Sequence, residues 1–217
     1  MFVAARGLAH TVHSMAAAFI GIFIGVLVGV GSLSLPTFQL LHAADSAAAT
    51  LYALAEGQLS RIQFLQQNAT YKIALLGCIA VIAPGVVAAL VAVAAKSLSA
   101  LRSVIAAVLA LLSLWALITL PLQQSLPLVV IAGLVFVSAV FPAILALRVV
   151  LWAIVGYLAT DHALAVWART DETVNATIIA FTAITRIDSP DLWRVLLSVL
   201  ALVPFYGAIS SATRAKG

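Results

Sequence analysis

The longest stretch of this chain without a charged residue runs from Ser103 to Leu147, and it contains no Asp, Glu, Lys or Arg. A water-soluble domain carries roughly 25% charged residues, whereas this chain of 217 residues is 65% hydrophobic and 8% charged. Such a chain has too few polar side chains to cover a surface that faces water. We therefore predict an all-α polytopic integral membrane protein with a single domain, 1–217.

Apolar run lengths predict about five membrane helices, because a crossing needs about 20 apolar residues for roughly 30 Å of hydrocarbon. The expected spans are 15–35, then 73–95 and 103–120 as a hairpin, then 126–159 and 173–213 as two long helices. Between the first two spans, residues 36–70 mix polar side chains with leucines at nearly helical intervals. This pattern is typical of an amphipathic helix on the membrane surface.

The expected helix over 126–159 meets no strong breaker before Thr160 apart from Pro142. It would be about 51 Å long at about 1.5 Å per residue, which is too long for an upright crossing. Such a helix must tilt strongly, kink at Pro142, or run partly along the membrane. The last two helices are accordingly expected to be long and tilted.

The remaining composition excludes several function classes. The eleven Lys and Arg residues are scattered, without interleaved aromatic residues, so membrane lipids and not nucleic acid are the expected partners of these charges. The four histidines do not lie at matching depths of the expected spans, and no metal or cofactor motif occurs. We predict no metal and no cofactor.

Small residues recur every four positions in the first span, at Ala17, Gly21, Gly25 and Gly29. This spacing puts them on one slowly drifting helix face, where the backbone of another helix can approach closely. A tight packing seam between helices is the favoured interpretation. A pore lining or an oligomer interface is the alternative.

Arg148 stands inside the apolar sequence FPAILALRVVLWAIVGYLA, residues 141–159. An arginine inside the bilayer costs about 2.5–3.5 kcal/mol on insertion scales. If the span ended near Leu147, the guanidinium could reach the lipid headgroups. However, the apolar sequence continues for eleven residues beyond Arg148, which favours a position within a helix and a specific role.

The arrangement around Arg148 resembles subunit a of the F-type ATP synthase, with Pro142 six residues before the arginine and Gly156 eight residues after it. The resemblance implies a proton-translocating stator whose Arg148 faces the rotor-ring carboxylates and separates two proton half-channels. It also implies Asp191 as a relay acid with Ser198 as a polar neighbour. The implied partners are other complex subunits, including a ring of hairpin subunits, in the mitochondrial inner membrane or alternatively a bacterial plasma membrane.

The chain departs from that family at Trp152, Tyr157 and Ser198, where the family has asparagine, histidine and glutamine. Two other function classes therefore stay open. One is a non-catalytic accessory subunit of a large respiratory or other energy-transducing membrane complex, in which Arg148 anchors packing or lipid. The other is a small independent transporter or channel, although no inverted repeat is visible. In none of these classes do we expect a catalytic site within this chain alone.

Overall fold

The computed structural model describes residues 2–31, 39–95, 99–141, 144–167 and 171–213, and in these ranges the secondary structure is nine α-helices and no β-strand. The predicted all-α polytopic membrane class is confirmed, because six described helices are long and apolar enough to cross a membrane. These six are α1 (Phe2–Gly31), α4 (Ala69–Ala95), α5 (Ser99–Thr119), α6 (Leu122–Val140), α7 (Leu145–Trp167) and α9 (Pro190–Thr213). The others are α2 (Gln39–Leu59), α3 (Gln63–Gln67) and α8 (Glu172–Thr185).

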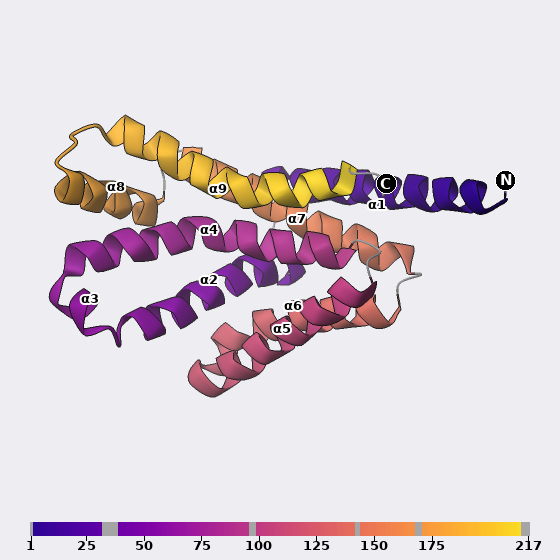
Figure 1. Ribbon diagram of the computed structural model, residues 1–217, viewed down its shortest axis with the longest axis horizontal. Coiled ribbons are helices and arrows are strands. Elements are labelled where there is room, and N and C mark those ends of the chain that lie inside the picture. Colours follow the sequence, from indigo (N-terminus) through magenta and orange to yellow (C-terminus); the bar gives the residue numbers. More distant parts are fainter. Residues whose placement is uncertain (1, 32–38, 96–98, 142–143, 168–170, 214–217) are drawn as a thin grey trace.

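The expected single long helix over 126–159 is wrong. The chain forms α6 up to Val140 and starts α7 at Leu145, and it reverses direction between them (Figure 1). Pro142, the predicted kink, lies outside the described residues. A proline at this position explains why α6 ends where it does. It has no N–H to donate to the Ser138 carbonyl, and it disfavours helical backbone at the residue before it. The number of candidate spans therefore rises from about five to six.

The expected helix over 173–213 also divides, into α8 and α9. Arg186 follows the last residue of α8 with a φ of 59°, in the left-handed region that commonly ends helices. Pro190 occupies the first position of α9, where its missing N–H has no helical partner to lose. The last predicted long helix, 173–213, is therefore a short helix followed by a candidate span.

The described part of the predicted surface segment 36–70, which starts at residue 39, does not lie apart from the membrane helices. Within it, α2 lies alongside α4 (Figure 1) and packs against α4 and α6. Its small residues Ala47 and Ala48, together with Thr50 and Leu54, are buried. Alanines allow such close approach, so the polar residues of α2 are brought against the membrane helices instead of lying apart from them.

The glycine seam of α1 packs along α7. A Cβ added at Gly25 would overlap the carbonyl oxygen of Ala153 and lie 2.8 Å from the Tyr157 amide nitrogen. Gly21 and Gly29 also face α7, at Trp152 and Thr160, while Gly156 faces the α1 backbone at Ile22. Ala17, at the start of the same seam, is buried. The two helices therefore touch backbone to backbone, which positions α7 within the bundle.

Arg102 joins the ends of three helices. Its side chain is 1% exposed and donates hydrogen bonds of 3.2 Å to the carbonyls of Ala95 at the end of α4 and Ser138 near the end of α6. Both carbonyls lie in last turns, where no helical N–H is available. A buried arginine in a span is thus explained by the two helix ends that it caps.

Candidate functional site

The three residues of the predicted proton pathway do not form one site. Arg148 is the fourth residue of α7 and Asp191 the second residue of α9. These two helices run in opposite directions, so their first turns lie at opposite ends of the bundle (Figure 1). Ser198, farther along α9, is buried, and its Oγ has no hydrogen-bond partner among the described residues. Arg148 instead lies near Arg102, close enough for the two positive charges to repel each other.

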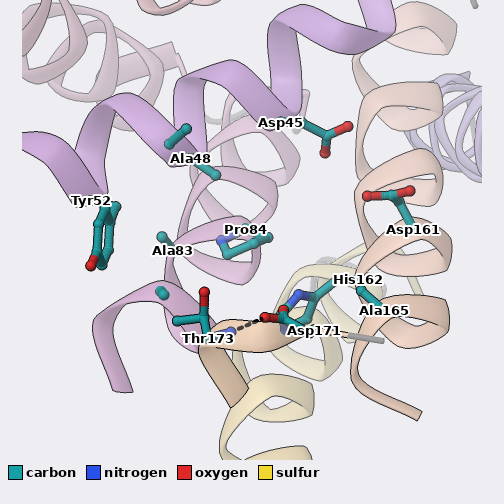
Figure 2. Close-up of a pocket in the computed structure, with 12 residues that line it drawn as sticks. Asp45, Ala48, Tyr52, Ala83, Pro84, Asp161, His162, Ala165, Asp171 and Thr173 are labelled. Carbon is teal, nitrogen blue, oxygen red and sulfur yellow. Dashed lines mark hydrogen bonds between the residues drawn. The ribbon is translucent and has the colours of Figure 1, made fainter. Parts of the chain in front are cut away.

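Acidic side chains gather in a different place, in a cavity of about 340 Å³ between α2, α4, α7 and α8 (Figure 2). Asp45 comes from α2, Asp161 and His162 from α7, and Asp171 from the residue before α8. The other lining residues are Ala48, Ala49, Tyr52, Ala80, Ala83, Pro84, Ala165 and Thr173. We refer to this cavity as the acidic pocket.

A hydrogen bond between α2 and α7 sets one wall of the acidic pocket. Tyr157 donates its hydroxyl proton to Oδ2 of Asp45 over 2.7 Å. Asp161 follows Tyr157 by one helical turn and so projects from the same side of α7. The carboxylates of Asp45 and Asp161 both point into the pocket (Figure 2). The packing of α7 against α1 therefore determines where these two acids meet.

Asp171 has a structural role at the opposite wall. Its Oδ1 accepts hydrogen bonds from the backbone N–H groups of Thr173 (2.8 Å) and Val174 (3.2 Å), so it is the N-cap of α8. These contacts stabilise its negative charge at the positive end of the helix dipole. Asp45 and Asp161 are therefore the carboxylates better placed to act on a ligand or proton.

His162 lies between the acidic pocket and α9. The residue is 9% exposed, and its ring packs on Phe205 with ring centroids 5.9 Å apart. The ring also hydrogen-bonds the Val81 backbone, whereas Nε2 has no partner among the described residues. A buried ring nitrogen without a partner marks a place where a bound group could donate a hydrogen bond.

The charge of the acidic pocket is opposite to that of the whole chain. The chain has seven Asp and Glu residues and a net charge of +4, yet three of the seven acids line this pocket and no Lys or Arg does. In the described part of the chain no group of three His, Cys, Asp or Glu side chains could hold a metal ion. Burial of Tyr52 raises the pKa of its hydroxyl and nearby Glu56 adds to this, so Tyr52 stays neutral. Because the lining is acidic and offers no metal-binding group among the described residues, the pocket suits protons or a polyatomic cation.

Sequence reasoning missed this site for identifiable reasons. It ended the expected helix at residue 159 and so left Asp161 and His162 outside every span, although apolar residues continue to Trp167. It treated Asp45 as part of a surface helix. The available signal was that an acid and a histidine occur together within the last two turns of an apolar run. The pairing of α2 with α7 was not visible in the sequence.

The fold and the site together define a polytopic helical membrane protein with an acidic pocket among its helices. Large apolar side chains such as Phe23, Ile118 and Ile179 remain exposed on its outer faces, as expected for contact with lipid. Comparison with protein-family models, with characterised proteins and with solved structures gives no match.

The N-cap at Asp171 gives a first prediction. Asp171→Ala should lower the free energy of unfolding by about 1 kcal/mol, because the Thr173 and Val174 amides lose their acceptor. Denaturant unfolding of the purified protein in detergent measures this change. Asp188→Ala is the matched control, since Asp188 is exposed and lies outside the helices. Equal stability of both variants would contradict the capping role.

Proposed function

We propose that this protein translocates protons across its membrane and that Asp45 and Asp161 are the proton carriers. The observation that carries the proposal is the acidic pocket, with three carboxylates and no Lys or Arg among its lining residues. Ionisable residues among membrane helices are costly, and they usually mark ion or proton pathways. Asp161 lies within a candidate span, Leu145–Trp167, and, unlike Asp171, it caps no described helix.

The depth of the acidic pocket supports a role in crossing the membrane. Its α4 residues Ala80, Ala83 and Pro84 lie close to the middle of a helix of 27 residues, which is about 40 Å long. If α4 crosses the bilayer, the pocket reaches the interior of the membrane. A carboxylate there can exchange a proton between the two sides, driven by about 2.3 kcal/mol per charge per 100 mV of membrane potential.

Membership of an F-type ATP synthase as a subunit a-like stator remains a further proposal, supported by the motif from Pro142 to Gly156. In that case Arg148 would face rotor carboxylates, and the membrane would be mitochondrial or bacterial. The first-turn position of Arg148 and its distance from Asp191 do not favour this pathway. We therefore place the proton carriers in the acidic pocket. The accessory-subunit alternative predicts no proton movement.

The experiment is proton flux in liposomes containing the purified full chain, with a pH-sensitive dye inside and an imposed potassium diffusion potential. Wild-type protein should acidify or alkalinise the lumen faster than protein-free liposomes. Asp161→Asn should return the rate to the protein-free level, because an amide cannot carry the proton. Asp188→Asn is the control, an exposed acid outside the pocket, and should retain the wild-type rate.

Two results would decide against this proposal. A wild-type rate equal to that of protein-free liposomes would favour the accessory-subunit alternative. An unchanged rate in Asp161→Asn together with loss of flux in Arg148→Ala would move the proton path to the arginine, as the stator reading expects. Retained flux in Arg148→Ala with loss in Asp161→Asn is the result that we expect.

A further inference from the structure

The acidic pocket is lined by hydrogen-bond acceptors that a proton pathway alone does not need. The hydrogen bond from the His162 ring to the Val81 backbone leaves Nε2 as the nitrogen without a partner. With the ring proton on the other nitrogen, Nε2 is a hydrogen-bond acceptor. The side chain is more than nine-tenths buried and belongs to the pocket lining. It therefore points to a ligand that donates a hydrogen bond.

A second acceptor comes from the backbone of α4. Pro84 lies inside this helix and has no N–H, so the Ala80 carbonyl lacks its usual helical donor. Ala80 and Pro84 both line the acidic pocket. The proline thus leaves a carbonyl without its usual donor in the middle of a candidate membrane helix, on a residue that lines the same pocket as Asp45 and Asp161.

The shape and chemistry of the pocket select among cations. A bare metal ion needs ligands that converge on one point, and the described side chains offer no such group. A cavity of about 340 Å³ falls in the size range of small-molecule sites. Its walls also include the Tyr52 ring and several alanine methyl groups (Figure 2). An aromatic ring and carboxylates around an apolar space are typical of sites for organic ammonium groups.

We propose that the acidic pocket binds a small protonated amine. The ammonium group lies between Asp45 and Asp161 and donates one hydrogen bond to Nε2 of His162. The alkyl part lies against Ala48, Ala83 and the Tyr52 ring. The inference rests on the proposed function, because entry of one ammonium displaces one proton from the carboxylates. When an amine is present on the other side of the membrane, the pocket would then exchange a proton for an organic cation, with one positive charge leaving for each that enters. Without an amine, protons alone would cross, driven by the membrane potential as proposed above.

The test is titration calorimetry of the full chain in detergent with n-butylammonium chloride. Saturable binding is expected, with no binding of n-butanol, which has the same alkyl chain without the charge. Asp161→Asn should weaken binding about tenfold or more, since it removes a charge-assisted hydrogen bond. His162→Leu should also weaken binding, while Asp188→Asn should bind like the wild type. Asp45→Asn serves as a second variant because its amide oxygen can still accept the Tyr157 hydroxyl.

The outcomes separate this inference from the proposed function. Equal heats for n-butylammonium chloride and sodium chloride would overturn the amine site. Amine affinity that is unchanged in both Asp161→Asn and His162→Leu would overturn it as well. Proton flux that depends on Asp161 without amine binding would overturn the amine site alone. Amine binding without any proton flux would overturn proton translocation, but it would support a small protonated amine as the ligand of the pocket. Flux accelerated by n-butylammonium on the opposite side of the membrane would support both.

Discussion

Replacement of Gly25 by alanine is expected to lower the free energy of unfolding by about 3 kcal/mol, the upper part of the usual range for overpacking. The added Cβ would overlap the Ala153 carbonyl and approach the Tyr157 amide. Both are backbone groups of α7, so no side-chain rotation can relieve the contact. The helices must separate along the seam. Tyr157 on α7 donates a hydrogen bond to Asp45. A displacement of α7 would therefore disturb this carboxylate, and proton flux should fall as well.

The control for this prediction is Gly133→Ala in α6, where an added Cβ meets nothing within 4 Å. That variant should be unchanged or slightly more stable, since alanine favours helix over glycine by up to about 1 kcal/mol. Denaturant unfolding followed by tryptophan fluorescence is a suitable measurement, because Trp152 is buried in the seam. If Gly25→Ala were as stable as Gly133→Ala, α1 would not pack on α7 by direct backbone contact.

Some of this fold follows from the sequence because it depends on local or periodic properties. The scarcity of charge predicts a helical membrane protein, since a backbone in lipid must satisfy its own hydrogen bonds. The four-residue spacing from Ala17 to Gly29 predicts a face that another helix can approach closely. Neither property says which helix packs there. That partner, α7, is specified by contacts between the two helices, such as that of Gly25 with Ala153 and that of Gly156 with Ile22.

The errors arose where an apolar run was read by length alone. A continuous run over 126–159 does not distinguish one tilted helix from two shorter ones, and the proline had to be treated as a break and not as a kink. The acidic pocket depends on contacts between residues far apart in the chain. Asp45 and Tyr157 are separated by 112 positions, and sequence periodicity carries no information about such a pair.

The second prediction with a large effect concerns Arg102. Arg102→Met should lower the free energy of unfolding by about 2–4 kcal/mol, because the buried carbonyls of Ala95 and Ser138 would each lose a charged donor. Removing the guanidinium also removes its desolvation cost and its repulsion by Arg148, which reduces the loss. The two unsatisfied carbonyls dominate, since neither has a helical N–H to replace the arginine.

Two further variants make this prediction specific. Arg102→Lys keeps the charge, but a single ammonium cannot span two carbonyls as a planar guanidinium does, so its stability should lie between those of Met and Arg. Arg61→Met is the control, since Arg61 is exposed and outside the candidate spans, and it should unfold like the wild type. If Arg102→Met matched the wild type, the cost of burying a charge beside Arg148 would equal the benefit of its two hydrogen bonds. The ends of α4 and α6 would then be held together by apolar packing, and the charge of Arg102 would need a role other than stability.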